Sequence, residues 1–181
     1  MNYSNEWLAD RIADGGQLDY LYFWGHRPGK GGTVIQSCLS QWFYASFGHE
    51  GRHFYTAEHW MMWHKALTFD DQLVADEVLT TFDVKMVKAL GRKVSNYDDA
   101  TWAAARYEAV VKGNLLKFSQ NPALKAYLLS TENKVIVEAS PYDKIWGIGM
   151  TAEEARQVDG PAGWRGTNLL GYALMEVRGR L

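Results

Sequence analysis

The ten residues from Ala57 to Ala66 constrain the fold of this chain more than any other stretch. They include no glycine, proline or β-branched residue, so they predict a helix, and Thr56 is suited to be its N-cap. Apolar positions almost circle the helix axis, which predicts a buried helix. Steps of four and three residues through Met62 place Glu58 and Lys65 on one face, two turns apart.

The two charges on this helix allow two interpretations. Burial of a carboxylate and an ammonium costs free energy unless they pair or serve a function. The first interpretation is a structural ion pair, or two charges that reach solvent. The second is a catalytic acid/base and an amine that line a pocket, because perturbed titratable groups gather at functional sites.

Composition excludes several classes of protein. At 181 residues, 47% of them hydrophobic, the chain predicts one folded domain over 1–181. A net charge of −2 argues against a general polyanion binder, although a local basic pocket is compatible with it. The single Cys38 allows no internal disulfide, and no signal peptide or long apolar run is present, which predicts a cytoplasmic protein without a membrane segment. Aromatic residues at 14% fit either a well-packed core or a pocket that stacks on planar rings.

The other predicted elements are mostly helices. No internal repeat, linker or domain boundary is visible, and 34–47 reads as a buried strand or bend. Helices are predicted at 5–12, 69–79, 83–90, 100–118, 123–129 and 169–177, and strands at 20–24 and 134–139.

Glycine-containing loops raise the question of an anion site. The basic loop Gly25–Thr33 is not a Walker A sequence, so it reads as a surface loop with at most a weak phosphate contact. Gly147 and Gly149 precede a capping box at 151–154, and a similar arrangement around Arg165 precedes the last helix. Exposed amides at two helix starts, together with Arg165, could hold a diphosphate, although such glycines usually form only turns and caps.

Histidines are concentrated between His49 and His64, where four of the five occur. Their spacing does not match the His-Glu-x-x-His pattern of zinc sites. His59 and His64 are five residues apart, so they do not lie on the same face of a helix. We therefore expect no metal ion.

A series of ordered motifs runs through most of the chain: Thr56-Ala57-Glu58-His59-Trp60-Met61-Met62 with Lys65-Ala66, Gly91-Arg92-Lys93-Val94, Trp102, Arg106, Gly113-Asn114 with Lys117-Phe118, Leu128-Leu129, Val137 to Asp143 with Ile145 to Gly149, and Trp164-x-Gly166-x-Asn168-Leu169-Leu170-Gly171 with Leu174-Met175. In these motifs the chain resembles the NADAR family of YbiA-like N-glycosidases, from about residue 20 to 180. The family pattern usually has Gln where this chain has His59, a departure that leaves Glu58 and Lys65 in place.

The resemblance implies a fold and an activity. The fold is a single compact domain, mainly α with a few short strands, and thus formally α+β. The activity is hydrolysis of a ribose C1–N bond without a cofactor. Two substrates are implied: ribosylaminopyrimidine intermediates of riboflavin synthesis, or ADP-ribose attached to guanine, including guanine in nucleic acid. Both combine a planar base, a ribose and phosphate.

Roles for individual residues follow from the resemblance and the chemistry. A carboxylate near C1 stabilises oxocarbenium character or activates water, and the leaving base needs a proton donor. We expect Glu58 to be the first carboxylate and Asp143 to be the second, with Glu138 as the alternative to Asp143. Lys65 is expected to be either a proton donor or a nucleophile. The expected substrate contacts are Trp102, Asn114, Glu138, Ser140, Trp146, Gly147, Gly149, Trp164, Arg165 and Asn168.

Two rival functions remain. A module that binds ADP-ribose or NAD without cleavage would have no need to bury Glu58 and Lys65. A duplex-binding protein would need a basic stripe, which the sequence lacks. The oligomeric state is left open.

Overall fold

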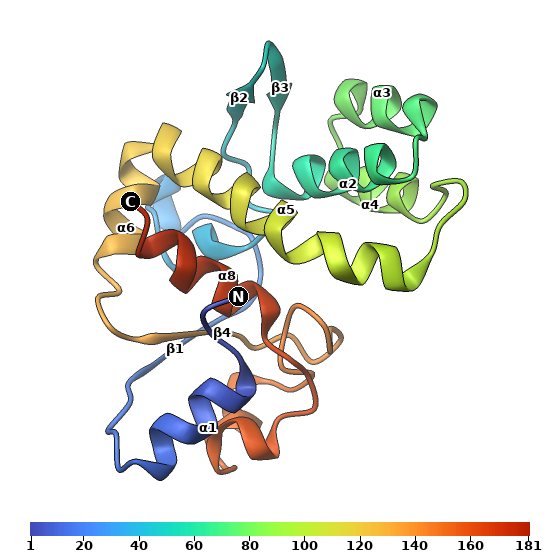
Figure 1. The fold of residues 1–181 in the computed structure, drawn as a ribbon. Helices are drawn as coiled ribbons and strands as arrows, with labels where there is room; N and C mark the ends of the chain where they lie inside the picture. Colours follow the sequence, from blue (N-terminus) through green and yellow to red (C-terminus); the bar gives the residue numbers. More distant parts are fainter. The chain divides into compact units, whose positions relative to one another are not determined.

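A computed structural model describes residues 1–181, and the expected class, mainly α with a few short strands, is confirmed (Figure 1). No helix combines the length and the apolar composition that a membrane span requires. The helices are α1 Asn5–Ala13, α2 Ala57–Thr68, α3 Gln72–Thr80, α4 Val84–Gly91, α5 Asp99–Gln120, α6 Pro122–Leu129, α7 Ala152–Ala155 and α8 Leu169–Arg178. The strands are β1 Tyr20–Phe23, β2 Phe47–His49, β3 Arg52–Phe54 and β4 Val135–Glu138.

Contacts within the chain gather into two compact units. The first unit consists of 1–40 and 123–181, and the second of 41–122. Because the first unit is assembled from two distant segments, no single point of the chain separates two consecutive domains. The expectation of one domain over 1–181 stays a prediction.

The first unit is organised around two short strands. β1 and β4 pair in parallel, with Tyr20 opposite Val135 and Phe23 opposite Glu138. Val135 to Val137 are at most 1% exposed, as expected for a parallel strand buried on both faces. Helix α8 packs against β4. The sequence predicted both strands, but not their pairing.

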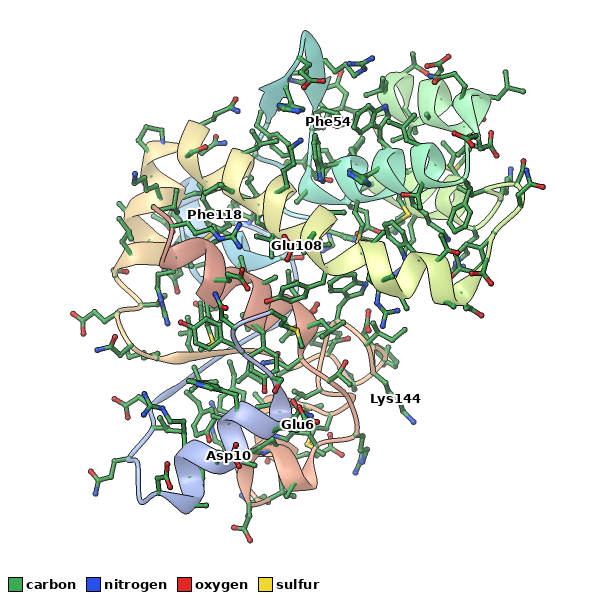
Figure 2. The ribbon with its side chains drawn as sticks, viewed as in Figure 1. Glu6, Asp10, Phe54, Glu108, Phe118 and Lys144 are labelled. Atoms are coloured by element: carbon green, nitrogen blue, oxygen red, sulfur yellow. The ribbon has the colours of Figure 1, made fainter.

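The second unit is organised around α2, which packs against α3, α4 and α5 (Figure 1). The Trp60 side chain is 1% exposed, and its indole N–H donates to the Ala109 carbonyl of α5 at 2.8 Å. A Cβ at Gly113 would overlap the Trp60 ring, so glycine allows the close approach of α5. Phe54, labelled in Figure 2, is fully buried, with its ring centre 5.2 Å from that of Trp60. The prediction of a buried central helix is confirmed.

The segment before α2 forms a hairpin that the sequence did not predict. β2 and β3 pair antiparallel, with Phe47 opposite Phe54. The turn residues Glu50 and Gly51 have φ of 50° and 74°, the left-handed values that two-residue hairpin turns require. Each strand has only three residues, which is too short to show a clear alternation of apolar and polar residues in the sequence.

Local capping follows the sequence closely. Thr56 accepts a hydrogen bond from the His59 amide at the start of α2, and Asp98 accepts one from the Thr101 amide at α5. The capping box of Thr151 and Glu154 is complete, although α7 has only four residues. These caps satisfy amide groups that lack partners within the helices.

Candidate active site

Glu58 lies in the first turn of α2 and its residue is only 3% exposed. Its amide donates to the Gln41 carbonyl at 2.9 Å, which connects the helix start to the preceding chain. The positive end of the helix dipole stabilises a carboxylate at this position. A buried carboxylate on the central helix agrees with the expectation for an acid/base, and capping electrostatics alone would also favour it.

Lys65 is half-buried near the other end of α2. Its Nζ donates to the Gly91 carbonyl at 2.7 Å and lies 4.0 Å from the centre of the Tyr97 ring. Burial lowers the pKa of Lys65, and the Asp99 carboxylate acts in the opposite direction. A larger share of this amine is therefore uncharged at neutral pH than in an exposed lysine.

His59, the departure from the family pattern, forms hydrogen bonds with both ring nitrogens. Nε2 lies 3.0 Å from the Thr81 carbonyl oxygen, and Nδ1 lies 2.8 Å from the Thr56 hydroxyl. A carbonyl can only accept, so Nε2 carries the proton and Nδ1 accepts from Thr56. Burial lowers the pKa of His59, which agrees with a neutral ring. His59 therefore links the start of α2 to the chain after α3.

The candidates on α5 are buried. Trp102 is 6% exposed, and Asn114 is fully buried. The Asn114 side-chain amide donates to the side chain of Gln41 at 2.7 Å and to the Val110 carbonyl at 2.9 Å. Through Gln41, the structure thus brings Asn114 and the start of α2 together within the second unit.

In the first unit, Asp143 organises a loop. Its Oδ1 accepts hydrogen bonds from the amides of Ile145 and Trp146, at 2.9 and 2.8 Å. Its carbonyl accepts from the Gly149 amide at 3.0 Å. These bonds give Asp143 a structural role that the sequence did not reveal, and its role as the second carboxylate stays a proposal.

The amides expected to bind an anion are occupied by carbonyls. The Ile148 amide donates to the Glu138 carbonyl at the end of β4, and the Gly149 amide donates to the Asp143 carbonyl. The amides of Thr167 through Leu170, at the start of α8, donate to the carbonyls of residues 144–147. The expectation of exposed amides is therefore corrected for Ile148, Gly149 and the start of α8, where the chain itself satisfies them.

The glycines in this region serve packing between two loops. A Cβ at Gly166 would lie 2.7 Å from the Lys144 Cα, and one at Gly147 would lie 2.8 Å from the Glu138 carbonyl oxygen. Lys144 is labelled in Figure 2. Such distances are shorter than van der Waals contact, so the two backbones approach each other only because side chains are absent. Gly147 and Gly149 stay proposed substrate contacts, but the Gly149 amide already donates to the Asp143 carbonyl.

The remaining candidates of the first unit have defined partners. Asn168 is fully buried in a left-handed conformation, and its side chain accepts from the Glu138 amide and donates to the Ile136 carbonyl. The Arg165 guanidinium pairs with Glu154 at 3.1 Å on the surface. Asn168 therefore connects β4 to α8, and one guanidinium nitrogen of Arg165 is already bound by Glu154.

Three further candidates complete this unit. Ser140 is buried, and its hydroxyl accepts from the Tyr142 amide at 3.4 Å. Trp146 is half-buried, and Trp164 is 9% exposed with an indole N–H that has no hydrogen-bond partner. The Trp164 ring lies edge-on to Tyr20, 6.4 Å between centres. Stacking of Trp146 and Trp164 on a substrate base stays a proposal.

Two buried polar residues escaped the sequence analysis. Gln41 is 6% exposed, and it stands in an otherwise largely apolar run, which is a signal that could have identified it. Lys117 is fully buried, with Nζ 5.0 and 5.8 Å from the ring centres of Phe118 and Phe43. In the sequence, Lys117 is distinguished only as part of a motif shared with the family.

Comparison with known proteins gives consistent matches. A model of the NADAR domain family matches residues 22–181. N-glycosidase R617 of Acanthamoeba polyphaga mimivirus is 43% identical over 164 residues, 88% of this chain and 94% of that protein. N-glycosidase YbiA of Escherichia coli (strain K12) is 30% identical over 132 residues, 73% of each chain. Riboflavin biosynthesis protein PYRR, chloroplastic, of Arabidopsis thaliana is 40% identical over 77 residues, 42% of this chain and 11% of that protein.

The fold also has a solved counterpart. The NMR structure of the E. coli protein YbiA superposes with a TM-score of 0.68, at 23% identity, covering 91% of this chain and 85% of that chain. At this identity the superposition establishes similarity of fold.

Proposed function

The chain belongs to the NADAR family, and from this premise we propose that it hydrolyses a ribose C1–N bond in a phosphorylated N-riboside. The expected class of enzyme, a hydrolase acting on N-glycosyl bonds, is confirmed by its N-glycosidase relatives. The phosphorylated riboside and the residues that act on it are the parts that we propose.

Lys65 supplies the observation that carries the proposal. It is a half-buried amine with a lowered pKa, on the same helix as the buried Glu58. A module that only binds its ligand has no chemical need for this combination. An enzyme that breaks a C–N bond uses both groups.

Glu58 is proposed to act on the ribose. Cleavage of the C1–N bond leaves positive charge on C1 and the ring oxygen in the transition state. A carboxylate held near C1 stabilises this charge, or it removes a proton from the attacking water. The burial of Glu58 supports this role, because electrostatic stabilisation is stronger where water is excluded.

Lys65 has two chemically distinct roles open to it. As a protonated donor it delivers a proton to the leaving base nitrogen. As a free amine it attacks C1 while the C1–N bond breaks, and the base leaves with the bonding electrons and takes up a proton. The ring then opens to a Schiff base between C1 and Nζ, and water hydrolyses this bond, releases the sugar and restores the amine. The lowered pKa supports the second role, because it raises the fraction of free amine.

We propose three further kinds of contact. Asp143 is the second carboxylate, and Arg165 contacts phosphate. Trp102, Trp146 and Trp164 are candidates for stacking on the planar base.

Two substrates fit the proposal. The first is a ribosylaminopyrimidine intermediate of riboflavin synthesis, which would release ribose 5-phosphate. The name of the relative PYRR, a riboflavin biosynthesis protein, favours this substrate. The second is ADP-ribose attached to guanine, which rests on family resemblance alone.

One experiment distinguishes the two substrates from each other and from binding without cleavage. The purified protein is incubated with each substrate, and products are identified by mass spectrometry. Release of ribose 5-phosphate, or of ADP-ribose, assigns the substrate. Tight binding of ADP-ribose or NAD with no product from either substrate would replace this proposal with the binding-module function.

A further inference from the structure

Two buried side-chain amides of the second unit meet directly. Asn114 Nδ2 lies 2.7 Å from Gln41 Oε1 and 2.9 Å from the Val110 carbonyl oxygen. A backbone carbonyl only accepts, so the Asn114 atom facing it is the nitrogen, and the Gln41 atom facing that nitrogen is the oxygen. The Val110 carbonyl therefore fixes the orientation of both amides. Gln41 Nε2, a donor, and Asn114 Oδ1, an acceptor, are left for other partners.

Neither remaining atom has a protein partner. Gln41 Nε2 and Asn114 Oδ1 are both buried without a hydrogen bond, and their residues are 6% and 0% exposed. Each is bonded to the same carbon as an atom of the 2.7 Å contact, so the two lie within about 7 Å of each other. Buried polar groups cost free energy when left unpaired. One hydroxyl oxygen can reach both atoms where they lie within about 6 Å of each other, and a partner from outside the chain that both donates and accepts would then satisfy the pair.

The amide pair lies beside the start of α2. The Gln41 carbonyl accepts from the Glu58 amide at 2.9 Å, so the backbone of Gln41 is held against the helix that carries the proposed catalytic carboxylate. Asn114 belongs to α5, which packs against α2 (Figure 1). A ligand bound between these amides lies close to the first turn of α2.

We propose that Gln41 Nε2 and Asn114 Oδ1 bind the 2-hydroxyl of the substrate ribose, which makes Gln41 a specificity-determining residue. This inference rests on the proposed function. A hydroxyl donates one hydrogen bond and accepts another, which matches one free acceptor and one free donor. The 2-hydroxyl adjoins C1, the carbon at which Glu58 is proposed to act. Hydrogen bonds to the 2-hydroxyl strengthen in the transition state of glycoside hydrolysis.

A permanently bound water is the competing occupant of this position. Buried waters make about two to four hydrogen bonds, and these side chains offer two unpaired atoms.

The test measures binding of ribose 5-phosphate and 2-deoxyribose 5-phosphate by calorimetry. Wild type should bind the ribose compound about 10- to 100-fold more tightly, because a site built for a hydroxyl discriminates against its absence. Gln41→Met keeps the length of the side chain and removes the amide, so this preference should fall at least about tenfold. Gln120→Leu is the matched control. The Gln120 side chain forms hydrogen bonds with the backbone N–H and the backbone carbonyl of Gly48, so its replacement should leave the sugar preference unchanged.

A second measurement does not depend on a variant. The side-chain amide signals of Gln41 in ¹⁵N-labelled wild type should shift on saturation with ribose 5-phosphate and shift less with the 2-deoxy compound. The inference is overturned if these signals do not move, if Gln41→Met retains the full preference, or if neither sugar phosphate binds. It is also overturned if a ligand-bound crystal structure shows only a water between the two amides. Release of free base from an N-riboside is assayed separately, so the proposed function stands or falls independently of the hydroxyl contact.

Discussion

The Nζ of Lys65 lies 4.0 Å from the centre of the Tyr97 ring, and the Tyr97 hydroxyl donates to Asp99 at 2.7 Å. The hydrogen bond of the same amine goes to a neutral group, the Gly91 carbonyl. An aromatic face stabilises an ammonium. Burial opposes this by lowering the pKa. The charge state of Lys65 therefore depends on a balance that single substitutions can shift.

Replacing Asp99 should change the pH dependence of activity. The Asp99 carboxylate raises the pKa of Lys65 against the effect of burial, so Asp99→Asn should lower this pKa further. The limb of the kcat/KM profile that reports Lys65 should move to lower pH, whichever protonation state is active. Asp98→Asn is the control, because asparagine also caps α5 and Asp98 is not among the groups that shift Lys65. Equal profiles for wild type and Asp99→Asn would contradict the coupling.

Substitutions at Glu58 should reduce turnover while leaving the fold intact. Glu58→Gln keeps the shape and removes the charge, so kcat should fall by about 10²- to 10³-fold. The control is Glu108→Gln, at an exposed position of α5 labelled in Figure 2, which should retain wild-type kcat. Thermal unfolding checks both variants. Near-normal turnover of Glu58→Gln would show that the carboxylate is structural.

Substitutions at Lys65 separate the two roles of the amine. Lys65→Met keeps the packing and should reduce kcat as severely as Glu58→Gln if the amine is the nucleophile. Lys65→Arg should not restore activity in that case, because guanidinium stays protonated. Borohydride added during turnover should leave a reduced sugar on Lys65, detected by mass spectrometry, and the exposed Lys85 should carry none. An active Lys65→Arg enzyme without an adduct would assign Lys65 as a cationic donor.

His59 should make the free energy of unfolding depend on pH. Its folded-state pKa is lowered by burial, so the unfolded chain binds the proton first, and stability should be lost as pH falls below about 6.5. Each unit of difference between the two pKa values corresponds to about 1.4 kcal/mol. His59→Gln should show a smaller loss between pH 7 and 5 in urea unfolding. His64, whose pKa is also lowered, is present in both proteins, so the difference reports His59. An unchanged slope would contradict the assignment.

Gly113 should be intolerant of a methyl group. Alanine normally stabilises a helix interior relative to glycine. Here its Cβ would overlap the Trp60 ring, so Gly113→Ala should reduce the free energy of unfolding by about 1–3 kcal/mol. Gly179→Ala is the control, since its φ is −72° and a Cβ there meets no atom closer than 3.6 Å. Equal stability of both variants would show that Trp60 adjusts freely.

The sequence by itself determined the features that depend on a few neighbouring residues. Residue propensity predicts that α2 is helical, and Thr56 is recognisable as its cap. Helical spacing places Glu58 and Lys65 on the same face of this helix. The capping box at Thr151 was visible for the same reason. These interactions span at most two turns of helix, so they can be inferred without knowing how the chain folds back on itself.

The tertiary structure alone decided which distant groups meet. Three contacts depend on the packing of remote segments. β1 pairs with β4, and Gln41 forms a hydrogen bond with Asn114 across 73 residues. The amides at the start of α8 donate to the carbonyls of residues 144–147. A glycine-rich loop before a helix has the same local sequence whether its amides face an anion or another backbone. Local propensity does not distinguish these cases, because the free energy that selects between them comes from contacts formed only in the folded chain.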